Sequence, residues 1–149
     1  MNERLPDGTP LYVCETERQF IGLALMCEAD EVLAVALDRN DFVDRSLGAV
    51  WAAAQEAARK GDPGLLYSVW LLERAGALDQ VGGIERLTDL MGKVLTDIPA
   101  FYLEPHAEII RDWSGRRKGV AAAAESAHRA YSGHHPRTVG IAVESIFSE

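Results

Sequence analysis

The sequence predicts an all-α fold, in which a small multi-helix head is followed by a long protruding helical hairpin. Helix caps and helix stops recur along residues 15–99, and no period-two alternation typical of strands interrupts them. From Pro105 to Tyr131 nothing breaks a helix, and Ser132-Gly133 then supplies a stop. A helix of roughly 27 residues spans about 40 Å, which is longer than a small head needs for its own core.

Five short helices are expected in the head. Thr16-Gln19 has the spacing of a capping box, Asp30 and Ser46 are candidate N-caps of the second and third helices, and Gly76 follows the fourth. Phe42 is expected to anchor the polar segment between the second and third. The apolar faces expected for the five helices are Phe20, Ile21, Ala24 and Leu25; Leu33, Ala36 and Leu37; Val50, Trp51, Ala54 and Ala58; Leu66, Val69, Trp70 and Leu72; and Ile84, Leu87, Leu90, Met91 and Val94.

The hairpin is expected to be an assembly device. Apolar residues recur along its long helix at alternating steps of three and four, the pattern of a helix that packs lengthwise on another helix. A shorter amphipathic stretch, Thr138 to Phe147, then returns. We expect residues 1–14 to form a tail, 15–99 the head and 100–149 the hairpin, together one domain. The residues expected to mediate self-association are Ile110, Trp113, Val120, Ala124, Ala127, Ile146 and Phe147.

The charge is unevenly distributed. Residues 1–100 contain 9 Lys and Arg against 17 Asp and Glu, a net charge of −8, whereas residues 101–149 contain 6 of each. An acidic head repels a phosphate backbone. The one basic run, Arg116-Arg117-Lys118, is flanked by acidic residues and is too small for a nucleic-acid patch. We therefore expect no tight direct binding to DNA.

The chemistry of an enzyme is missing from the sequence. Gly92-Lys93 is followed by Val94 inside an expected helix, so there is no phosphate-binding loop, and Gly82-Gly83 is interpreted as a permissive helix start. His128, His134 and His135 lack a fourth ligand at zinc-like spacing. We expect no catalytic residue, no metal and no cofactor.

The cellular location is expected to be the cytoplasm. The N-terminus has no signal-peptide pattern, and no apolar run approaches the roughly 18 residues of a membrane span. Cys14 and Cys27 have no metal-like spacing and are expected to be free thiols. The three tryptophans are expected to pack in apolar cores.

Several short motifs, in order, resemble the N-terminal domain of the DnaB-type hexameric replicative DNA helicases. The similarity runs from about residue 14 to residue 149. The motifs are Glu17 to Leu25 (Glu-x-x-x-apolar-Gly-x-small-Leu), Asp41-Phe42, Val50-Trp51, Gly61-Asp62-Pro63, Gly76 to Gly83 (Gly-x-Leu-x-x-Val-Gly-Gly), Leu87 and Leu90, Ile98-Pro99, Ala107 to Asp112 with Arg116-Arg117, and Ala142 to Phe147.

The chain departs from the family pattern at four places. Leu47-Gly48 replaces a frequent His-Arg, Gly64-Leu65 replaces Ile-Asp, an asparagine is missing near Phe101-Tyr102, and His106 replaces a tyrosine. These positions are expected at surfaces or turns. The departures indicate a divergent member, of the kind found in phages or mobile elements.

The resemblance implies a non-catalytic collar domain. In this family, heads and hairpins pack into dimers and then a trimer of dimers, and the collar docks the helicase-binding domain of primase and contacts loaders. Tyr102, Ile109, Arg116 and Arg117 are the candidate partner-binding residues. The ATPase would follow a linker, so the chain is expected to be either a fragment cut at the domain boundary or a free-standing copy.

Four other interpretations remain open. The chain resembles primase's own helicase-binding domain, although Gly82-Gly83 and Ile146-Phe147 favour the helicase. A free-standing mimic of the collar could capture a host helicase or primase. A helical transcription regulator would need a basic recognition helix, which the acidic head disfavours. An enzyme with an unrecognised site is the fourth.

Overall fold

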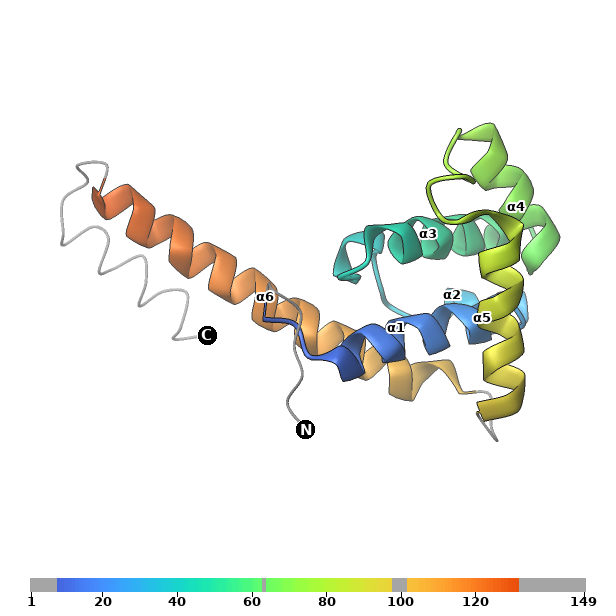
Figure 1. Ribbon diagram of the computed structural model, residues 1–149, viewed down its shortest axis with the longest axis horizontal. Coiled ribbons are helices and arrows are strands. Elements are labelled where there is room, and N and C mark those ends of the chain that lie inside the picture. Colours follow the sequence, from blue (N-terminus) through green and yellow to red (C-terminus); the bar gives the residue numbers. More distant parts are fainter. Residues whose placement is uncertain (1–7, 63, 98–101, 132–149) are drawn as a thin grey trace. The chain divides into compact units, whose positions relative to one another are not determined.

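All elements of the structure are helices in the residues that it describes, 8–62, 64–97 and 102–131 (Figure 1), in a computed structural model of the chain. In chain order they are α1 (Leu11–Ala24), α2 (Ala29–Leu33), the 3₁₀ helix η1 (Arg39–Asp41), α3 (Arg45–Arg59), α4 (Leu65–Arg74), α5 (Gly83–Asp97) and α6 (Leu103–Tyr131). The all-α prediction is confirmed. The chain divides into two compact units, Met1–Arg111 and Asp112–Glu149, and α6 contributes to both.

The first unit is larger than the head expected from the sequence. It begins within the expected tail, because α1 starts at Leu11 and Val13 is already buried. It also takes in the first two turns of α6, which bury Leu103, Ala107 and Ile110 in the core. Burial of three apolar side chains from α6 makes this part of the helix a structural part of the head.

An aromatic cluster lies at the centre of this core. Phe20 of α1 and Trp51 of α3 are both fully buried, with ring centroids 4.9 Å apart, and Phe42 lies 5.9 Å from Phe20. The indole N–H of Trp51 donates to the carbonyl of Leu37 at 2.9 Å, which satisfies the one polar atom of that ring. The face expected for the third helix is confirmed, since its four residues are all buried, namely Val50, Trp51, Ala54 and Ala58.

Glu17 joins α1 to the turn that precedes α3. Its side chain is fully buried, and its carboxylate accepts hydrogen bonds from the backbone N–H groups of Val43 at 2.7 Å and Asp44 at 3.1 Å. A buried carboxylate is tolerated only when its oxygens are hydrogen-bonded. Because both N–H groups immediately precede α3, this carboxylate sets where α3 begins relative to α1.

Asp44 extends this linkage to α5. It caps α3 by accepting hydrogen bonds from the backbone N–H and the hydroxyl of Ser46. The prediction that Ser46 is the N-cap of this helix was therefore wrong. Arg86 of α5 donates to Asp44 at 3.1 Å and to the Ser46 hydroxyl at 2.7 Å. Burial alone would raise the pKa of Asp44, but the hydrogen bonds from Ser46 and Arg86 and the charge of Arg86 outweigh it and lower that pKa.

The crossing of α1 and α5 depends on Gly22 (Figure 1). A Cβ atom at this position would lie 2.5 Å from the carbonyl oxygen of Leu90 and 2.7 Å from Cγ2 of Val94. The two helix backbones therefore approach too closely for any side chain between them. Leu90 and Val94 are buried on the α5 face that meets α1, as the sequence predicted.

Two helix starts differ from the sequence prediction. Thr16 lies inside α1, where its hydroxyl donates to the carbonyl of Tyr12 at 2.7 Å, and the N-cap is Pro10. The hydroxyl therefore bonds back along the helix instead of capping it. In α2 the N-cap is Glu28, which forms a capping box with Glu31, and not the expected Asp30; the helix ends at Leu33, before Ala36 and Leu37.

The buried face of α4 was predicted correctly only in part, since Val69 and Leu72 face the core and the other two expected residues do not. Leu66 is 79% exposed and Trp70 44%, whereas Ser68 and Leu72 face the core. The hydroxyl of Ser68 donates to the carbonyl of Gly64 at 2.7 Å, so a polar residue can lie there without an unsatisfied group. Apolar residues surround α4 on all sides, and periodicity therefore could not select the buried side.

The ends of the other elements follow the predictions in part. Gly76 has φ 71° just after α4, as expected for a helix stop, and Gly82 and Gly83 also have positive φ before and at the start of α5. Helix α6 starts two residues before Pro105 and ends at Tyr131 as predicted. The expected returning stretch, 138–147, lies outside the described residues, so the hairpin stays a prediction.

Replacing Gly22 by alanine should destabilise the fold. The added Cβ forces α1 and α5 apart, and overpacking of this kind costs about 1–3 kcal/mol of unfolding free energy. Gly92→Ala is the matched control, because nothing lies within 4 Å of a Cβ at that site in the interior of α5. It should stabilise the protein by about 0.5–1 kcal/mol. Urea denaturation measures both; equal effects of the two substitutions would contradict this packing.

The ion pair of Asp44 should make stability depend on pH in acid. The pKa of Asp44 is lowered in the folded protein, so its contribution is present above the ordinary aspartate pKa of about 4 and is lost as the pH falls through the folded value. Asp44→Asn keeps a capping oxygen but removes the charge, and should cost at most about 1 kcal/mol at pH 7. Denaturation at pH 7 and pH 3 tests this: the gap between parent and variant should shrink in acid, and a constant gap would refute it.

Candidate interaction surfaces

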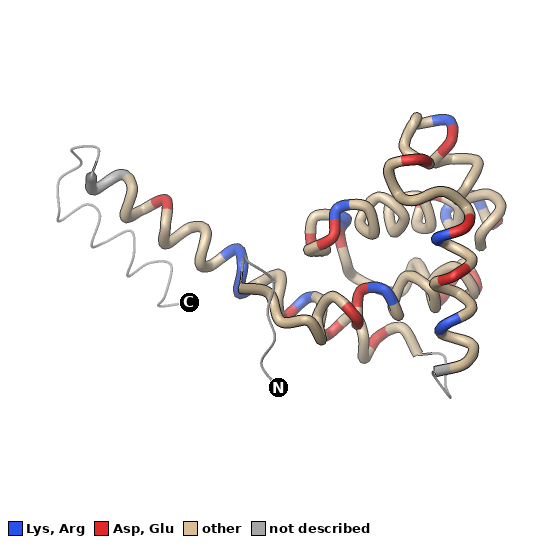
Figure 2. The backbone as a smooth tube through the Cα atoms, in the orientation of Figure 1, with Lys and Arg blue, Asp and Glu red and all other residues tan. Residues whose placement is uncertain are grey.

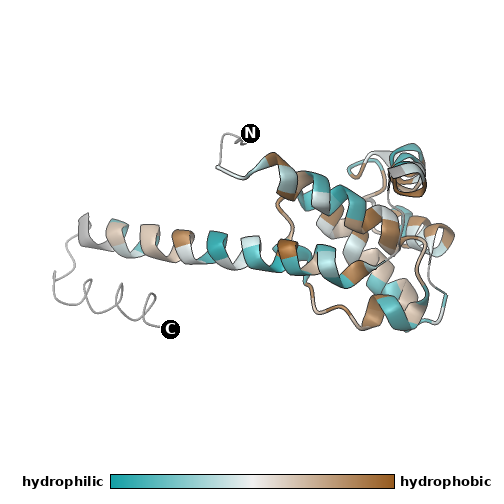
Figure 3. Ribbon diagram, turned by 90° about the horizontal axis from the view of Figure 1, so that it is seen from below, coloured by the Kyte–Doolittle hydropathy of each residue, from teal (hydrophilic) through white to brown (hydrophobic). Residues whose placement is uncertain are grey.

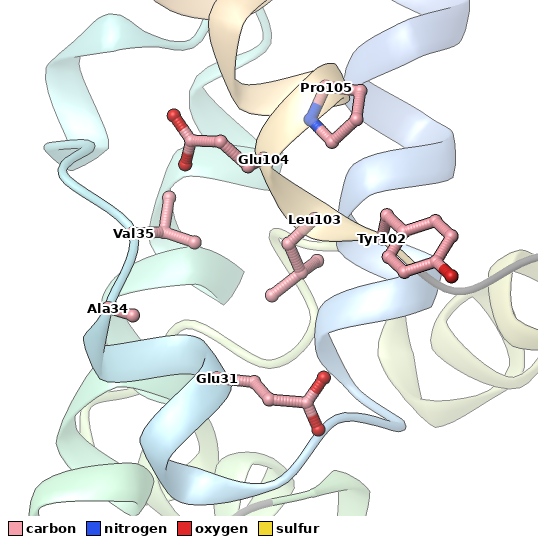
Figure 4. A pocket seen from close by; sticks show the side chains of 7 residues that line it. All are labelled: Glu31, Ala34, Val35, Tyr102, Leu103, Glu104 and Pro105. Carbon is pink, nitrogen blue, oxygen red and sulfur yellow. The ribbon is translucent and has the colours of Figure 1, made fainter.

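A shallow groove lies where α6 begins. It has a volume of about 300 Å³ and runs between α2, the segment after it and the first turn of α6 (Figure 4). Its apolar floor and two carboxylate-bearing side chains come from segments about seventy residues apart in the sequence. The lining residues are Glu31, Ala34, Val35, Tyr102, Leu103, Glu104 and Pro105.

Tyr102 combines a fixed backbone with an exposed ring. Nδ1 of His106 lies 3.3 Å from the carbonyl oxygen of Tyr102, and Nε2 of the same ring lies 3.2 Å from Oε1 of Gln19 in α1. The next residue, Leu103, is buried in the core. The side chain of Tyr102 itself is 69% exposed. An aromatic ring presented on a firmly held backbone is well suited to contact a partner.

The two carboxylates of the groove already have neighbours. Glu31 accepts a hydrogen bond from the backbone N–H of Glu28 at 3.3 Å, and Glu104 pairs with Arg111 at 3.0 Å. Arg111 also donates from Nε to the carbonyl of Ala36 at 3.1 Å, which ties α6 to the segment after α2. These contacts hold the two walls of the groove together.

Cys27 lies close to this region as a buried free thiol, on the bend after α1. Burial, with a smaller contribution from the charge of Glu31, raises the pKa of Cys27 to about 11. A thiol with so high a pKa carries almost no thiolate at neutral pH and is a poor nucleophile. This position does not offer catalytic chemistry.

The other candidate partner-binding residues are on α6. Ile109 is 40% exposed, in the first unit. In the second unit, Arg116 is exposed and pairs with Asp112 at 3.2 Å, whereas Arg117 is half-buried. Tyr102, Ile109 and Arg116 are therefore accessible, and Arg117 is the least accessible of the four.

Ile110, one of the residues expected to mediate self-association, lies inside the head. Its side chain is fully buried in the core of the first unit, because the first turns of α6 pack into the head. Trp113 is half-buried, and Val120 is 71% exposed. Ala124 and Ala127 are exposed, while Ile146 and Phe147 lie outside the described residues. The accessible seam is thus Val120, Ala124 and Ala127, at steps of four and three along α6.

The stretch of α6 that carries this seam has few charges. After the basic run at residues 116–118, Glu125 is the only charged residue up to His128 (Figure 2). Figure 3 shows the same stretch mostly in pale brown, as its alanines require. An exposed helix face with so little charge favours contact with another helix over contact with water alone.

Metal, membrane and tryptophan predictions can be compared with the described residues. Among the described residues, no group of three or more His, Cys, Asp and Glu side chains could hold a metal ion. His128 is exposed, and His134 and His135 lie outside them. None of the described helices is long and apolar enough to cross a membrane. Of the three tryptophans, Trp51 alone is fully buried.

A comparison with protein families matches residues 9–112 to the family described as DnaB-like helicase N terminal domain. The chain belongs to this family. The match covers the whole head and the first turns of α6, the part whose packing is described above. No curated protein matches the chain in a comparison of sequences. The N-terminal domain is the non-catalytic part of these helicases.

The structure gives physical reasons for the family motifs. In the first motif, Glu17 supplies the buried carboxylate and Gly22 the close approach to α5. Leu47-Gly48, expected at the surface, is buried instead: a Cβ on Gly48 would lie 2.3 Å from the carbonyl oxygen of Arg39. At this site η1 packs directly on α3, and the close approach leaves no room for a side chain at residue 48. Of the other departures, His106 is partly buried, and Gly64 is the N-cap of α4 with φ 110°.

Sequence reasoning missed two surfaces. The groove could not be predicted, because Val35 and Leu103 share no local pattern. The exposed side of α4 was assigned to the core, although its Trp70 is next to Arg74, a pair more typical of surfaces than of cores.

Proposed function

We propose that this chain forms part of the collar of a hexameric replicative DNA helicase, where it assembles with further copies and docks a primase or a helicase loader. The family match over residues 9–112 is the observation that carries the proposal. A domain built of a rigid helical core with exposed apolar side chains on α6 supports a role in assembly.

Self-association through α6 is the first part of the proposal. Val120, Ala124 and Ala127 offer a narrow apolar seam, and small side chains allow a second helix to approach closely. The head contributes its own core and needs nothing from this seam, because Val120 is 71% exposed.

Val120→Asp should weaken self-association, because it places a carboxylate on the buried face of the assembly. We expect the dissociation constant to rise at least ~10-fold. Lys118→Asp is the control, since Lys118 is exposed and two residues away, on the opposite side of the helix. Sedimentation velocity at tens of micromolar measures both. A parent that stays monomeric at millimolar concentration refutes this part of the proposal.

Docking of a replication protein at the start of α6 is the second part. The groove offers an apolar floor beside the exposed ring of Tyr102, and Ile109 lies two turns further along α6. We propose the C-terminal helical domain of the cognate primase as the partner, and a loader as the alternative. Neither interaction requires nucleotide or DNA.

Tyr102→Ala should reduce the affinity for the primase domain by about 10- to 30-fold, the range of a binding hot spot. Tyr12→Ala is the matched control, because Tyr12 on α1 is 58% exposed and lies outside the groove. Titration calorimetry should show no change for this control. A second test, Arg116→Glu with Arg117→Glu, separates the α6 arginines from the groove.

The outcomes separate the site from the function. If the parent binds primase and Tyr102→Ala binds equally well, the groove is the wrong site. If the parent binds the loader and not the primase, the partner changes while the collar role stands. A parent that binds neither protein and does not self-associate contradicts the proposed function.

A further inference from the structure

The exposed side of α4 carries residues typical of binding hot spots. Leu66 is 79% exposed and Trp70 44%. Tyr67 and Arg74 lie on the same side, because Tyr67 is three residues before Trp70 and Arg74 is four residues after it. We call Leu66, Tyr67, Trp70 and Arg74 the α4 face. It lies opposite the side that enters the core, so core packing does not account for it.

Two contacts between its side chains fix the conformation of the α4 face. The rings of Tyr67 and Trp70 stack with centroids 5.3 Å apart and 18° between their planes. The guanidinium carbon of Arg74 lies 4.8 Å from the centroid of the Trp70 ring. Side chains that are ordered before binding lose less conformational entropy when a partner arrives. Trp, Tyr and Arg are also the residues that contribute most binding energy at interfaces.

Arg74 determines the charge of the expected partner. Within the described part of the chain, the one contact recorded for its guanidinium is with the Trp70 ring, and no carboxylate pairs with it. A guanidinium stacked on a ring keeps the N–H donors of its edge available, and these match the two oxygens of a carboxylate. Arg74 therefore complements an acidic side chain.

The spacing determines the shape of the partner. Leu66, Trp70 and Arg74 follow at intervals of four residues, so they extend about 12 Å along the helix axis. A partner helix that presents a carboxylate and two apolar side chains at successive turns would meet all three. This is how amphipathic helices are recognised in general.

Single-stranded nucleic acid complements the α4 face less well. Tyr67 lies one turn before Trp70 and Arg74 one turn after it, and both already stack on the indole where a base would have to stack. The net charge of −8 over residues 1–100 also repels a phosphate backbone.

We propose that the α4 face docks an acidic amphipathic helix of a partner protein, with a partner carboxylate bound to Arg74 and partner apolar side chains packed on Trp70 and Leu66. This surface goes beyond the proposed collar function and is separate from the groove at Tyr102. It gives the head a second, charge-selective docking site.

The test uses the full chain and two designed stapled helical peptides of about 16 residues, long enough to stay helical when stapled. One peptide presents Leu, Leu and Glu at successive turns on one face, and its twin has Lys in place of Glu. Backbone amide NMR shifts locate binding. The acidic peptide should shift α4 amides and bind at least ~10-fold more tightly than the twin. General attraction to a chain of net charge −8 would give the opposite order, so the preference is diagnostic.

Variants make the test specific. Arg74→Glu should reverse the preference between the two peptides, and Trp70→Ala should weaken the acidic peptide at least ~10-fold. Arg116→Glu is the control, because Arg116 is an exposed arginine on α6 and should leave peptide binding unchanged. Circular dichroism and thermal unfolding confirm that each variant is folded.

Four results would overturn the proposal. They are equal binding of the two peptides, shifts that avoid α4, perturbation of the same α4 amides by an oligothymidine, and concentration-dependent dimerisation that Trp70→Ala abolishes without any peptide binding. The third result would assign the α4 face to nucleic acid, and the fourth to contact between copies of this chain.

Discussion

The buried carboxylate of Glu17 is the constraint on which the head depends. It accepts hydrogen bonds from the backbone N–H groups of Val43 and Asp44 in the turn before α3, and the side chain of Asp44 binds Arg86 of α5. Three helices distant in sequence are thereby held by one continuous polar network. Because a buried charge without its partners is strongly unfavourable, the network allows one arrangement of α1, α3 and α5 and disfavours others.

This fixed core allows both candidate surfaces to form. Leu103 is buried while its neighbour Tyr102 is exposed, and Leu72 is buried while Trp70, half a turn earlier, is exposed. In each case the apolar anchor orients a helix so that an aromatic side chain faces outward. The exposed aromatic residues therefore owe their positions to the core, and the surfaces they form are rigid enough to recognise a partner. The hydrogen bonds of His106 and Arg111 play the same role for the groove.

Much of the head could be predicted where one side of a helix is clearly more apolar than the other. The buried face of α3 and the stop at Gly76 followed from spacing alone. The start predicted for α1 was wrong. A threonine hydroxyl can accept a hydrogen bond at a helix cap or donate one back along the helix, and the neighbouring sequence does not show which it does. The buried face predicted for α4 was wrong at Leu66 and Trp70, because apolar residues surround this helix.

The sequence by itself determined the class of fold, the family and the absence of excess charge from residues 101–149, since these depend on local periodicity, ordered motifs and composition. Tertiary structure alone decided what each motif residue does. Glu17 and Gly22 are five residues apart, yet one reaches the turn before α3 and the other allows the approach of α5. Ile110, expected in an association seam, is buried in the core, and Val35 and Leu103 line the same groove. The reason is physical: burial and close approach depend on helices that pack from distant parts of the chain, and local spacing carries no information about which helix will be the neighbour.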